Sequence, residues 1–492
     1  MRRRLFIAAI AIVALAWAGL VIWATGEDGP QQAETFDGQP NVVLVIGCTL
    51  RRDMLSPYAM RAPKGVSPFI GRIAANGAKF SNAYAAAPWT KAASTALLTG
   101  YHPIQVGMIE PGPLSNRRRL SDEVTTLGEH LHGAGYETIG IVSNPNLNEL
   151  FGFGQGFDDY VELSDVWREG QNPKISGQAV TEAALQAVDR RGKGDAPLFL
   201  RVMYVDAHAP ITVPRDQVLE FKDRGSVETP YRVWEYRAGV RRFDDAVEKL
   251  WNGLRQRGFS KRDTLLVVVN DHGEGLAWPA KNQGLGHGNF TFQGPVGMPW
   301  IVFGSGVAQG HEIGGVASQV DVLPTLLGMV GVESSYDGPG QDWSAAVRGE
   351  VAYTTREHVF VDTHFQAADR AAVYTSEVAC HRDGTTPQLK KGRKNSRMLP
   401  RILCHDNRED PYGLEPFDKV DVDVLSALDH WRSEAMATYE AFEWTDDALP
   451  SKATQAQLEA LGYVDGDGAL DGGVPASALD EASEIVEDLV IE

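Results

Sequence analysis

Five predominantly apolar runs along the chain predict buried β-strands. None of them alternates with polar positions, which is typical of strands that are covered on both faces of a sheet. They span Asn41–Ile46, Thr138–Val142, Leu198–Val205, Thr264–Val269 and Pro299–Phe303.

Segments with helical spacing lie between and after these runs. Their apolar positions recur every three or four residues, and several end at a glycine. They are Ser67–Gly77, Ala92–Leu98, Leu127–His132, Tyr236–Gly258 and a helix that begins at Asp321. Strands that alternate with helices in this way predict an α/β fold.

Polar residues follow several of the predicted strands directly. Cys48 comes just after the first strand and His208 just after the third. Ligands of open α/β sheets collect beyond the carboxyl ends of the strands, so both residues are candidates for a site. A buried free cysteine also packs as a small apolar residue, and a histidine beside an aspartate also forms structural hydrogen bonds. The local pattern leaves these alternatives open.

The fourth strand runs straight into Asp271-His272-Gly273. An adjacent aspartate and histidine can ligate one metal ion, because Gly273 permits close packing where the chain turns. His287 lies between two glycines in a later loop that could fold back over the same site.

Thr90 opens an alanine- and leucine-rich segment that Thr99-Gly100 closes, and Pro88 prevents a preceding helix from continuing into it. A hydroxyl at this position faces free backbone N–H groups and the positive end of the helix dipole, which stabilise an alkoxide or an oxyanion. Local evidence alone favours an ordinary threonine N-cap over a nucleophile.

The amino-terminal segment has the pattern of an export signal. Arg2-Arg3-Arg4 precede an uncharged apolar run from Leu5 to Ala24, which is long enough to span a bilayer. We expect residues 1–24 to anchor the chain in the cytoplasmic membrane, with a linker over residues 25–40 and the catalytic domain outside the cytoplasm. Secretion after cleavage behind Ala18 is the alternative.

The chain of 492 residues carries a formal net charge of −19, which argues against nucleic acid as a partner. A small anionic substrate therefore requires a local positive site. Of the three cysteines, Cys380 and Cys404 are close in sequence, and an exported protein permits a disulfide between them. Cys48 is then left over.

From about Val351 the pattern changes to short strand-like runs and turns. It predicts a smaller antiparallel sheet with a covering helix near Val424–Phe442, and we interpret the basic stretch Lys390–Lys394 as a solvated hairpin. We assign residues 41–350 to a catalytic domain and 351–464 to a C-terminal subdomain. Residues 465–492 hold nine acidic and no basic side chains, which predicts a disordered tail.

Seven motifs together resemble the sulfatases of the alkaline phosphatase superfamily, in the order of that family and from about Asn41 to Val464. They are NVVLVIGCTLRRDML, FSNAYAAAPWTKAASTALLTG, GFGQGFDDY, VDAHAP, TLLVVVNDHGEG, QVDVLPTLLGMVGV and LEALGYV. The resemblance implies an alkaline-phosphatase-like mixed sheet flanked by helices, with a smaller C-terminal antiparallel-sheet subdomain.

The resemblance also implies site residues, with departures. The sulfatase signature C/S-x-P-S-R places Thr90 at the nucleophile position, where threonine cannot become formylglycine, and Ser94 replaces the signature arginine. Cys48 stands where sulfatases carry a metal-binding aspartate. His208 and His287 fall where the family contacts the ester oxyanion.

Phosphoethanolamine and phosphoglycerol transferases of the same superfamily look similar at these positions. They use an unmodified threonine nucleophile and one zinc ion, held by glutamate, that threonine, aspartate and histidine. Transferred to this chain, the metal-ligand set is Cys48, Thr90, Asp271 and His272. A thiolate suits softer metals, so we expect one divalent ion, zinc or manganese rather than calcium.

The sequence therefore favours a metal-dependent hydrolase of sulfate or phosphate esters, with Thr90 as nucleophile. His208, His287 and Lys91 would neutralise charge on the ester oxygens. Candidate substrates are small anionic esters, including lipid- and glycan-linked ones. A membrane-anchored phosphoryl-group transferase is the second hypothesis. A catalytically silent, sulfatase-like binding protein is the third, because Cys48 and Ser94 depart from the family together.

Overall fold

The computed structural model describes most of the chain from residue 36 to residue 460. The described ranges are 36–58, 65–109, 118–163, 175–192, 194–222, 229–279, 284–351, 355–365, 369–384, 402–441 and 451–460. The predicted anchor 1–24, most of the linker 25–40, the basic stretch 390–394 and the acidic tail 465–492 lie outside these ranges. No helix in the described ranges combines the length and the apolar character that crossing a bilayer requires.

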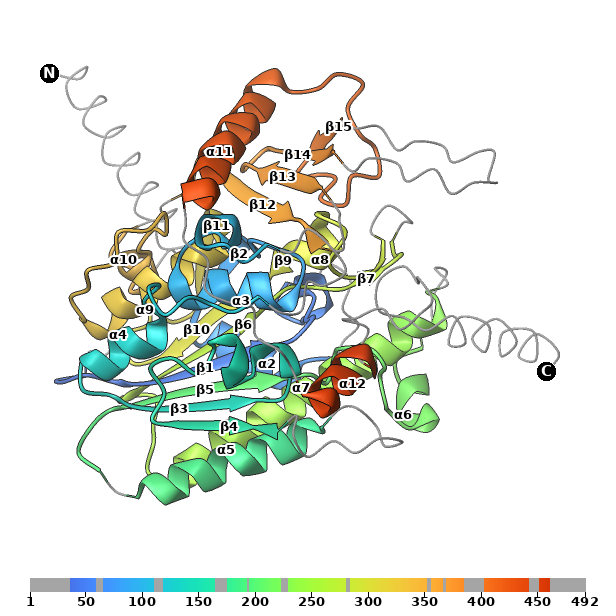
Figure 1. Cartoon of the computed structure of the whole chain (residues 1–492). Helices are drawn as coiled ribbons and strands as arrows, with labels where there is room; N and C mark the ends of the chain where they lie inside the picture. Colours follow the sequence, from blue (N-terminus) through green and yellow to red (C-terminus); the bar gives the residue numbers. More distant parts are fainter. Residues whose placement is uncertain are drawn as a thin grey trace, which may run out of the picture.

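A mixed sheet forms the centre of the molecule (Figure 1). In the described residues it has nine strands in the order β11-β2-β10-β6-β1-β5-β3-β4, with β9 paired to β2. Strands β10 and β9 run against the direction of the others. The bounds are β1 Asn41–Gly47, β2 Ala78–Tyr84, β3 Glu137–Val142, β4 Asp159–Glu162, β5 Leu198–Tyr204, β6 Thr264–Asn270, β9 Gly297–Met298, β10 Trp300–Gly304 and β11 His311–Ser318.

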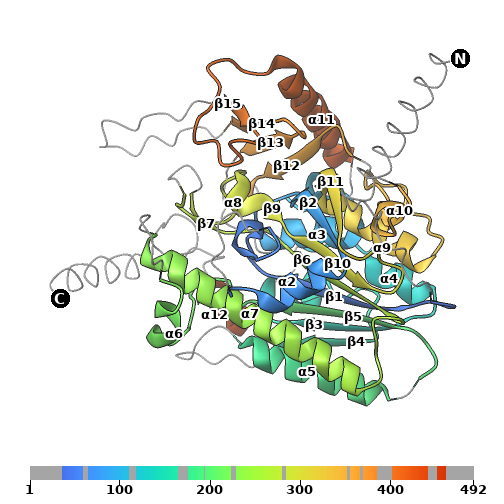
Figure 2. The ribbon, with the colours of Figure 1, turned by 180° about the vertical axis from the view of Figure 1, so that it is seen from behind.

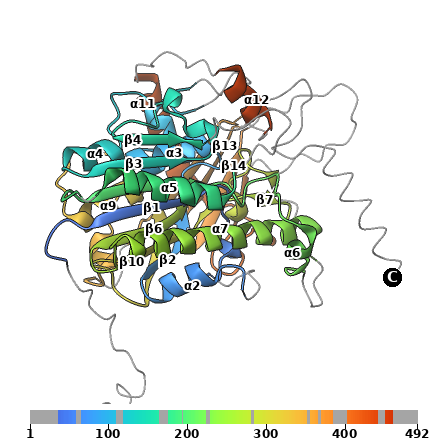
Figure 3. The ribbon, with the colours of Figure 1, turned by 90° about the horizontal axis from the view of Figure 1, so that it is seen from below.

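Helices cover both faces of this sheet, as Figure 3 shows from below. Strand β1 lies between β5 and β6 and presents Val42, Leu44 and Ile46 to one core and Val43 and Val45 to the other. Both sets are buried, which explains why its sequence does not alternate with polar residues. On the first face lie α3 Thr90–Thr99, α4 Leu127–Gly133, α9 Val322–Val330 and α10 Ser344–Val347; on the second lie α2 Pro68–Ala75, α5 Gly177–Arg191 and α7 Tyr231–Gln256.

Short elements complete the main body. Within the described ranges they are α6 Arg215–Leu219, α8 Gln293–Val296, the two-stranded ribbon of β7 Gly275–Leu276 and β8 Leu285–Gly286, and 3₁₀ turns at Arg52–Met54, Pro103–Val106, Pro145–Leu147, Glu149–Phe151 and Gln319–Asp321. Helix α12 Lys452–Ala460 returns to the main body, where Leu458 is fully buried in the same core as α3.

A smaller antiparallel sheet stands beside the main sheet, as the view from behind shows (Figure 2). Its strands are β12 Val359–Thr363, β13 Arg370–Tyr374, β14 Val378–Asp383 and β15 Ile402–Asp406. Helix α11 Val422–Ala441 packs on its outer face through Leu425 and Leu428. The inner face joins the main body, where the rings of Tyr374 and Tyr84 stack with centroids 4.1 Å apart. The predicted fold class is therefore confirmed.

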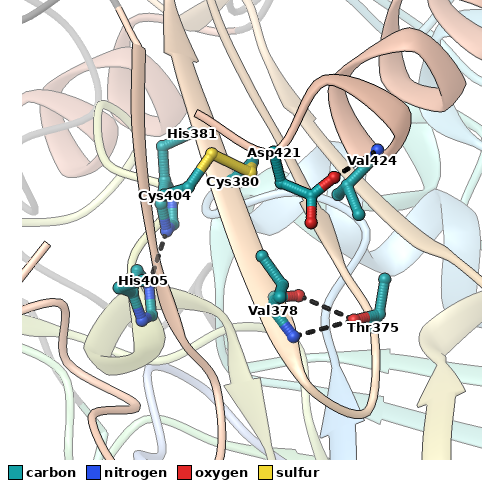
Figure 4. The surroundings of a disulfide bond; sticks show 8 residues. All are labelled: Thr375, Val378, Cys380, His381, Cys404, His405, Asp421 and Val424. Carbon is teal, nitrogen blue, oxygen red and sulfur yellow. Dashed lines mark hydrogen bonds between the residues drawn. A yellow bond between two sulfur atoms is a disulfide. The ribbon is translucent and has the colours of Figure 1, made fainter. Parts of the chain in front are cut away.

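Cys380 and Cys404 lie opposite each other on β14 and β15 and form the disulfide that the sequence suggested (Figure 4). Their neighbours His381 and His405 project from the other face of the sheet, with the two Nε2 atoms 3.1 Å apart. Cys48 is a buried free thiol.

The structure corrects the local interpretation of Thr90 as an N-cap. Trp89 is the N-cap, in extended conformation, and Thr90 is the first helical residue of α3. Its side chain therefore leaves from the first turn of the helix, and its hydroxyl can contact residues outside the helix.

Candidate functional site

Four of the predicted residues converge where β1 and β6 end and α3 begins. Cys48 follows β1, Asp271 and His272 follow β6, and Thr90 starts α3. Strands β1 and β6 are parallel neighbours, so their carboxyl ends meet at the same edge of the sheet. All four side chains are fully buried.

Cys48, Asp271 and His272 form a group that could hold a metal ion. One ligand atom from each lies within 4.8 Å of the other two. Asp271 Oδ1 accepts hydrogen bonds from the backbone N–H groups of Thr49 (3.0 Å) and His272 (2.7 Å). Among the described residues its buried Oδ2 has no hydrogen-bond partner, which is unusual for a native carboxylate.

His272 is oriented as a metal ligand requires. Its Nδ1 lies 2.7 Å from the carbonyl oxygen of Gly273, which can only accept, so Nδ1 carries the proton. Nε2 then keeps its lone pair, and it lies 3.5 Å from Asp271 Oδ2. Proteins usually fix the orientation of a metal-ligating histidine through a hydrogen bond that its other ring nitrogen donates, as Nδ1 does here.

Thr90 places its hydroxyl directly against this group. Oγ1 lies 3.3 Å from His272 Nε2 and 3.9 Å from Cys48 Sγ. The position at the amino terminus of a ten-residue helix adds the positive end of the helix dipole. The hydroxyl is therefore a nucleophilic candidate in contact with two of the candidate metal ligands.

The electrostatics of the group favour a bound cation. Burial and then the Asp271 carboxylate raise the pKa of the Cys48 thiol well above its ordinary value, and burial lowers the pKa of His272. A divalent ion would favour the thiolate and take the place of the thiol proton of Cys48. The donor set, with one carboxylate oxygen lacking a partner, fits such an ion.

His208 and His287 stand beside this group. The ring centroid of His287 lies 4.8 Å from that of His272 and 5.1 Å from that of His208. The carbonyl oxygen of Ala209 accepts a hydrogen bond from Nδ1 of His208. Both rings are almost completely buried. The structure thus brings three of the predicted histidines together.

Lys91 is also fully buried, one residue beyond Thr90. Its Nζ lies 3.5 Å from the centroid of the Phe151 ring and donates a hydrogen bond to the carbonyl oxygen of Arg118 at 3.3 Å. A cation over an aromatic face is stabilised by the ring quadrupole, so these contacts hold the ammonium group in the interior.

A family model described as "Sulfatase" matches residues 40–332 of the chain. The chain belongs to the sulfatase family. Membership places it among the hydrolases that act on sulfuric esters, most of which depend on a metal ion. The matched region contains all seven predicted site residues.

Curated sulfatases are similar to this chain at low identity. The Delta 4,5-hexuronate-2-O-sulfatase of Bacteroides thetaiotaomicron is 23% identical over 367 residues, which cover 66% of this chain and 75% of the relative. The uncharacterized sulfatase YidJ of Escherichia coli is 21% identical over 362 residues, covering 62% of this chain and 70% of the relative.

Solved structures confirm the sulfatase fold. A 2-O GAG sulfatase superposes with a TM-score of 0.63 at 16% identity, over 88% of this chain and 99% of that chain. The phosphonate monoester hydrolase of Agrobacterium radiobacter superposes with a TM-score of 0.62 at 18% identity, over 82% of this chain and 96% of that chain.

Two further polar residues of this sulfatase contact the predicted site and escaped the sequence interpretation. Asn144 Nδ2 donates a hydrogen bond to Cys48 Sγ at 3.4 Å, and Glu274 Oε2 lies 3.3 Å from His287 Nδ1. Asn144 follows β3 as Cys48 follows β1, so the rule of strand ends could have identified it. Glu274 lies two residues after His272, in the same strand-end motif.

Proposed function

We propose that the chain hydrolyses a sulfate or phosphate ester with Thr90 as nucleophile at a single-metal site. The observation that carries the proposal is the position of Thr90 Oγ1, 3.3 Å from His272 and 3.9 Å from Cys48 at the amino terminus of α3. Cys48, Asp271, His272 and Thr90 itself would hold the ion.

The thiol of Cys48 bears on the identity of the metal. Calcium takes oxygen ligands, whereas zinc accepts thiolate, imidazole and carboxylate together. We therefore propose zinc, or manganese as the alternative, in place of calcium. When bound, a divalent ion supplies Lewis-acid chemistry, in that it lowers the pKa of a coordinated hydroxyl and polarises an ester oxygen.

The chain's own residues then account for the remaining steps. Thr90 Oγ1 attacks the sulfur or phosphorus in line with the leaving group, and the helix terminus stabilises the alkoxide. His208, His287 and Lys91 neutralise the negative charge on the oxygens of the transferred group. One of the two histidines gives a proton to the leaving oxygen, and water then hydrolyses the ester on Thr90.

The absence of formylglycine chemistry affects the choice of substrate. A threonine ester lacks the second hydroxyl with which a formylglycine hydrate expels sulfate, so an external nucleophile must resolve it. This requirement favours phosphate esters over sulfate esters, and it favours a second candidate function, in which an acceptor alcohol takes the group from Thr90. The relatives include proteins named for sulfated sugars and for phosphonate monoesters.

The place of action follows from the predicted anchor. We propose that Leu5–Ala24 holds the chain in the cytoplasmic membrane with the catalytic domain outside the cytoplasm, or that the segment is removed on secretion. Either location gives access to an ester on a glycan or a lipid headgroup.

A panel of aryl sulfate, aryl phosphate and aryl phosphate diester tests the proposal with wild type, Thr90→Ser and Thr90→Ala. We expect Thr90→Ser to keep measurable activity and Thr90→Ala to lose about 10³-fold or more, as nucleophile removal does in other hydrolases. Equal rates in wild type and Thr90→Ala would contradict it and favour a silent binding protein. A stable ester on Thr90 that only an added alcohol releases would favour the transferase.

A further inference from the structure

The turn that contains Cys48 has a strained backbone. The N–H of Leu50 donates a hydrogen bond to the carbonyl oxygen of Gly47 at 3.3 Å, which closes a four-residue turn with Cys48 and Thr49 at its centre. Thr49 has a φ of 56°, in the left-handed region. Type II turns favour a glycine at this third position, because a β-branched side chain fits the left-handed region poorly. Such a conformation persists only where neighbouring groups hold it.

The turn positions two members of the candidate metal group. Cys48 continues the contact of β1 with β5, since its N–H donates to the carbonyl oxygen of Tyr204 at 2.8 Å. The next N–H along the chain, that of Thr49, donates to Asp271 Oδ1 at 3.0 Å. This hydrogen bond crosses from the end of β1 to the end of β6 and fixes one oxygen of Asp271, while Oδ2 lies 3.5 Å from His272 Nε2. The path of the backbone at Thr49 therefore affects how Cys48 and Asp271 lie relative to each other.

Tyr236 of α7 bridges this turn with its hydroxyl. The oxygen accepts a hydrogen bond from the N–H of Arg51 at 2.7 Å, and the hydroxyl donates to the carbonyl oxygen of Thr49 at 2.5 Å. Both roles are fixed, because an N–H group can only donate and a carbonyl oxygen can only accept. All three residues are fully buried. Loss of the hydroxyl would therefore leave two buried backbone groups without this partner, which is costly.

The turn is packed tightly against α7. A Cβ atom added to Gly47 would lie 2.7 Å from Leu50 Cδ2 and 3.2 Å from Phe243 Cε2 of α7. This packing brings the helix against the turn, and the hydrogen bond from Tyr236 is the directed contact that holds the carbonyl group of Thr49.

We propose that Tyr236 is a positioning residue of the candidate metal site. Its hydroxyl holds Thr49 in the left-handed conformation, and the resulting path of the backbone keeps Cys48 and Asp271 placed for one ion. The inference rests on the proposed function for the presence of a metal and on the turn for the role of the tyrosine. Helix α7 contributes none of the predicted ligands, and through Tyr236 it would still determine how tightly they bind.

Tyr236→Phe removes the hydroxyl and keeps the ring, so it should weaken zinc binding about 10-fold, as expected for a group that supports a ligand. Zinc affinity is measured by competition with a chromophoric chelator. Thr49→Gly removes the cost of the left-handed conformation. In Thr49→Gly, adding Tyr236→Phe should therefore weaken zinc binding by about 2-fold or less. A merely structural role would give the same loss in both backgrounds, and that result, or full affinity in Tyr236→Phe, would overturn the proposal.

Tyr58→Phe is the matched control. The Tyr58 hydroxyl also bridges backbone groups, since it accepts from the N–H of Trp300 at 3.0 Å and donates to the carbonyl oxygen of Trp300 at 3.4 Å. Trp300 belongs neither to the turn nor to the predicted ligand set. Tyr58→Phe should lower the urea midpoint and leave zinc affinity as in wild type. A loss of affinity equal to that in Tyr236→Phe would show a general loosening of the fold and would overturn the proposal.

Urea unfolding of the metal-free variants separates the inference from the proposed function. Tyr236→Phe should lower the midpoint more in wild type than in Thr49→Gly, because glycine needs no support for a positive φ. If wild type bound neither zinc nor manganese, the proposed function would fail at its metal, while this difference would still decide whether Tyr236 holds the turn. Equal shifts in the two backgrounds would overturn the role of Tyr236 even if wild type bound zinc.

Discussion

Asn144 donates its side-chain amide to the sulfur of Cys48, over a separation of 96 residues in sequence. The orientation of the amide is fixed, because its oxygen accepts hydrogen bonds from the backbone N–H and the side-chain amide of Asn146. An N–H group directed at the sulfur favours the thiolate over the thiol, and the thiolate is the form that ligates a metal.

We therefore expect Asn144→Ala to weaken metal binding by roughly 10- to 100-fold, the usual effect of removing the partner of a ligand. Asn146→Ala removes only the side-chain hydrogen bond to the Asn144 oxygen and keeps the backbone one, so it should weaken metal binding less. Metal affinity is measured by competition with a chromophoric chelator. Equal affinity in wild type and Asn144→Ala would show that the amide does not act on the sulfur.

Cys48 is expected to determine which metal the site prefers. Cys48→Asp replaces the soft sulfur with the carboxylate that sulfatases carry, so preference should move from zinc towards calcium or magnesium. Cys48→Ser, which offers a weaker ligand, should bind either ion poorly. Reactivation of apo-protein with each ion in turn measures the preference. If the ions reactivated Cys48→Asp in the same order of effectiveness as wild type, Cys48 would be excluded as a ligand.

The sequence predicted the fold and the convergence of the strand-end residues for one physical reason. Strands covered on both faces have mostly apolar sequences without polar alternation, and the residues just after parallel strands lie at one edge of the sheet. Cys48, His208 and Asp271 were found in this way. The placement of these residues came from local pattern, whereas the roles of Thr90 as nucleophile and Cys48 as metal ligand came from the resemblance to known families.

Features that depend on distant contacts or on one backbone torsion were not predictable. The N-cap interpretation of Thr90 is wrong because the extended conformation of Trp89 moves the helix start by one residue. Strands β2 and β11 were missed because they carry polar residues, such as Lys79 and Glu312, which form a partly exposed ion pair across the two strands. Glu274 acquires its partner only when the chain returns at His287.

The buried pair His381 and His405 should make stability depend on pH. Burial and the neighbouring His405 lower the pKa of His381 well below 6.5, and burial also lowers the pKa of His405. Below pH ~6.5 the unfolded chain therefore binds protons that the folded chain does not, and the free energy of unfolding decreases as pH falls.

His381→Gln should reduce that dependence by up to about 1.4 kcal/mol per pH unit, the contribution of one proton. His430→Gln on the exposed surface of α11 is the control and should leave the slope as in wild type. Urea unfolding between pH 5.5 and pH 7.5 measures both. Equal slopes of unfolding free energy against pH in wild type and His381→Gln would contradict the role given to this histidine.

The disulfide between Cys380 and Cys404 closes a loop whose ends are 24 residues apart in sequence. By the chain-entropy model its removal in Cys380→Ser/Cys404→Ser should lower stability by about 3 kcal/mol. Turnover of a small aryl ester should change little at permissive temperature, because both cysteines face α11 and not the main body. A thermal midpoint equal to that of wild type would contradict the expectation.

The central claim is that Thr90 forms a covalent ester during turnover, and acid quenching followed by peptide mass spectrometry tests it most directly. Wild type quenched with an ester substrate should carry one sulfuryl or phosphoryl group on Thr90, while resting enzyme carries unmodified threonine and Thr90→Ala carries no adduct. Turnover with the adduct on another residue, or an adduct that persists in Thr90→Ala, would contradict the account.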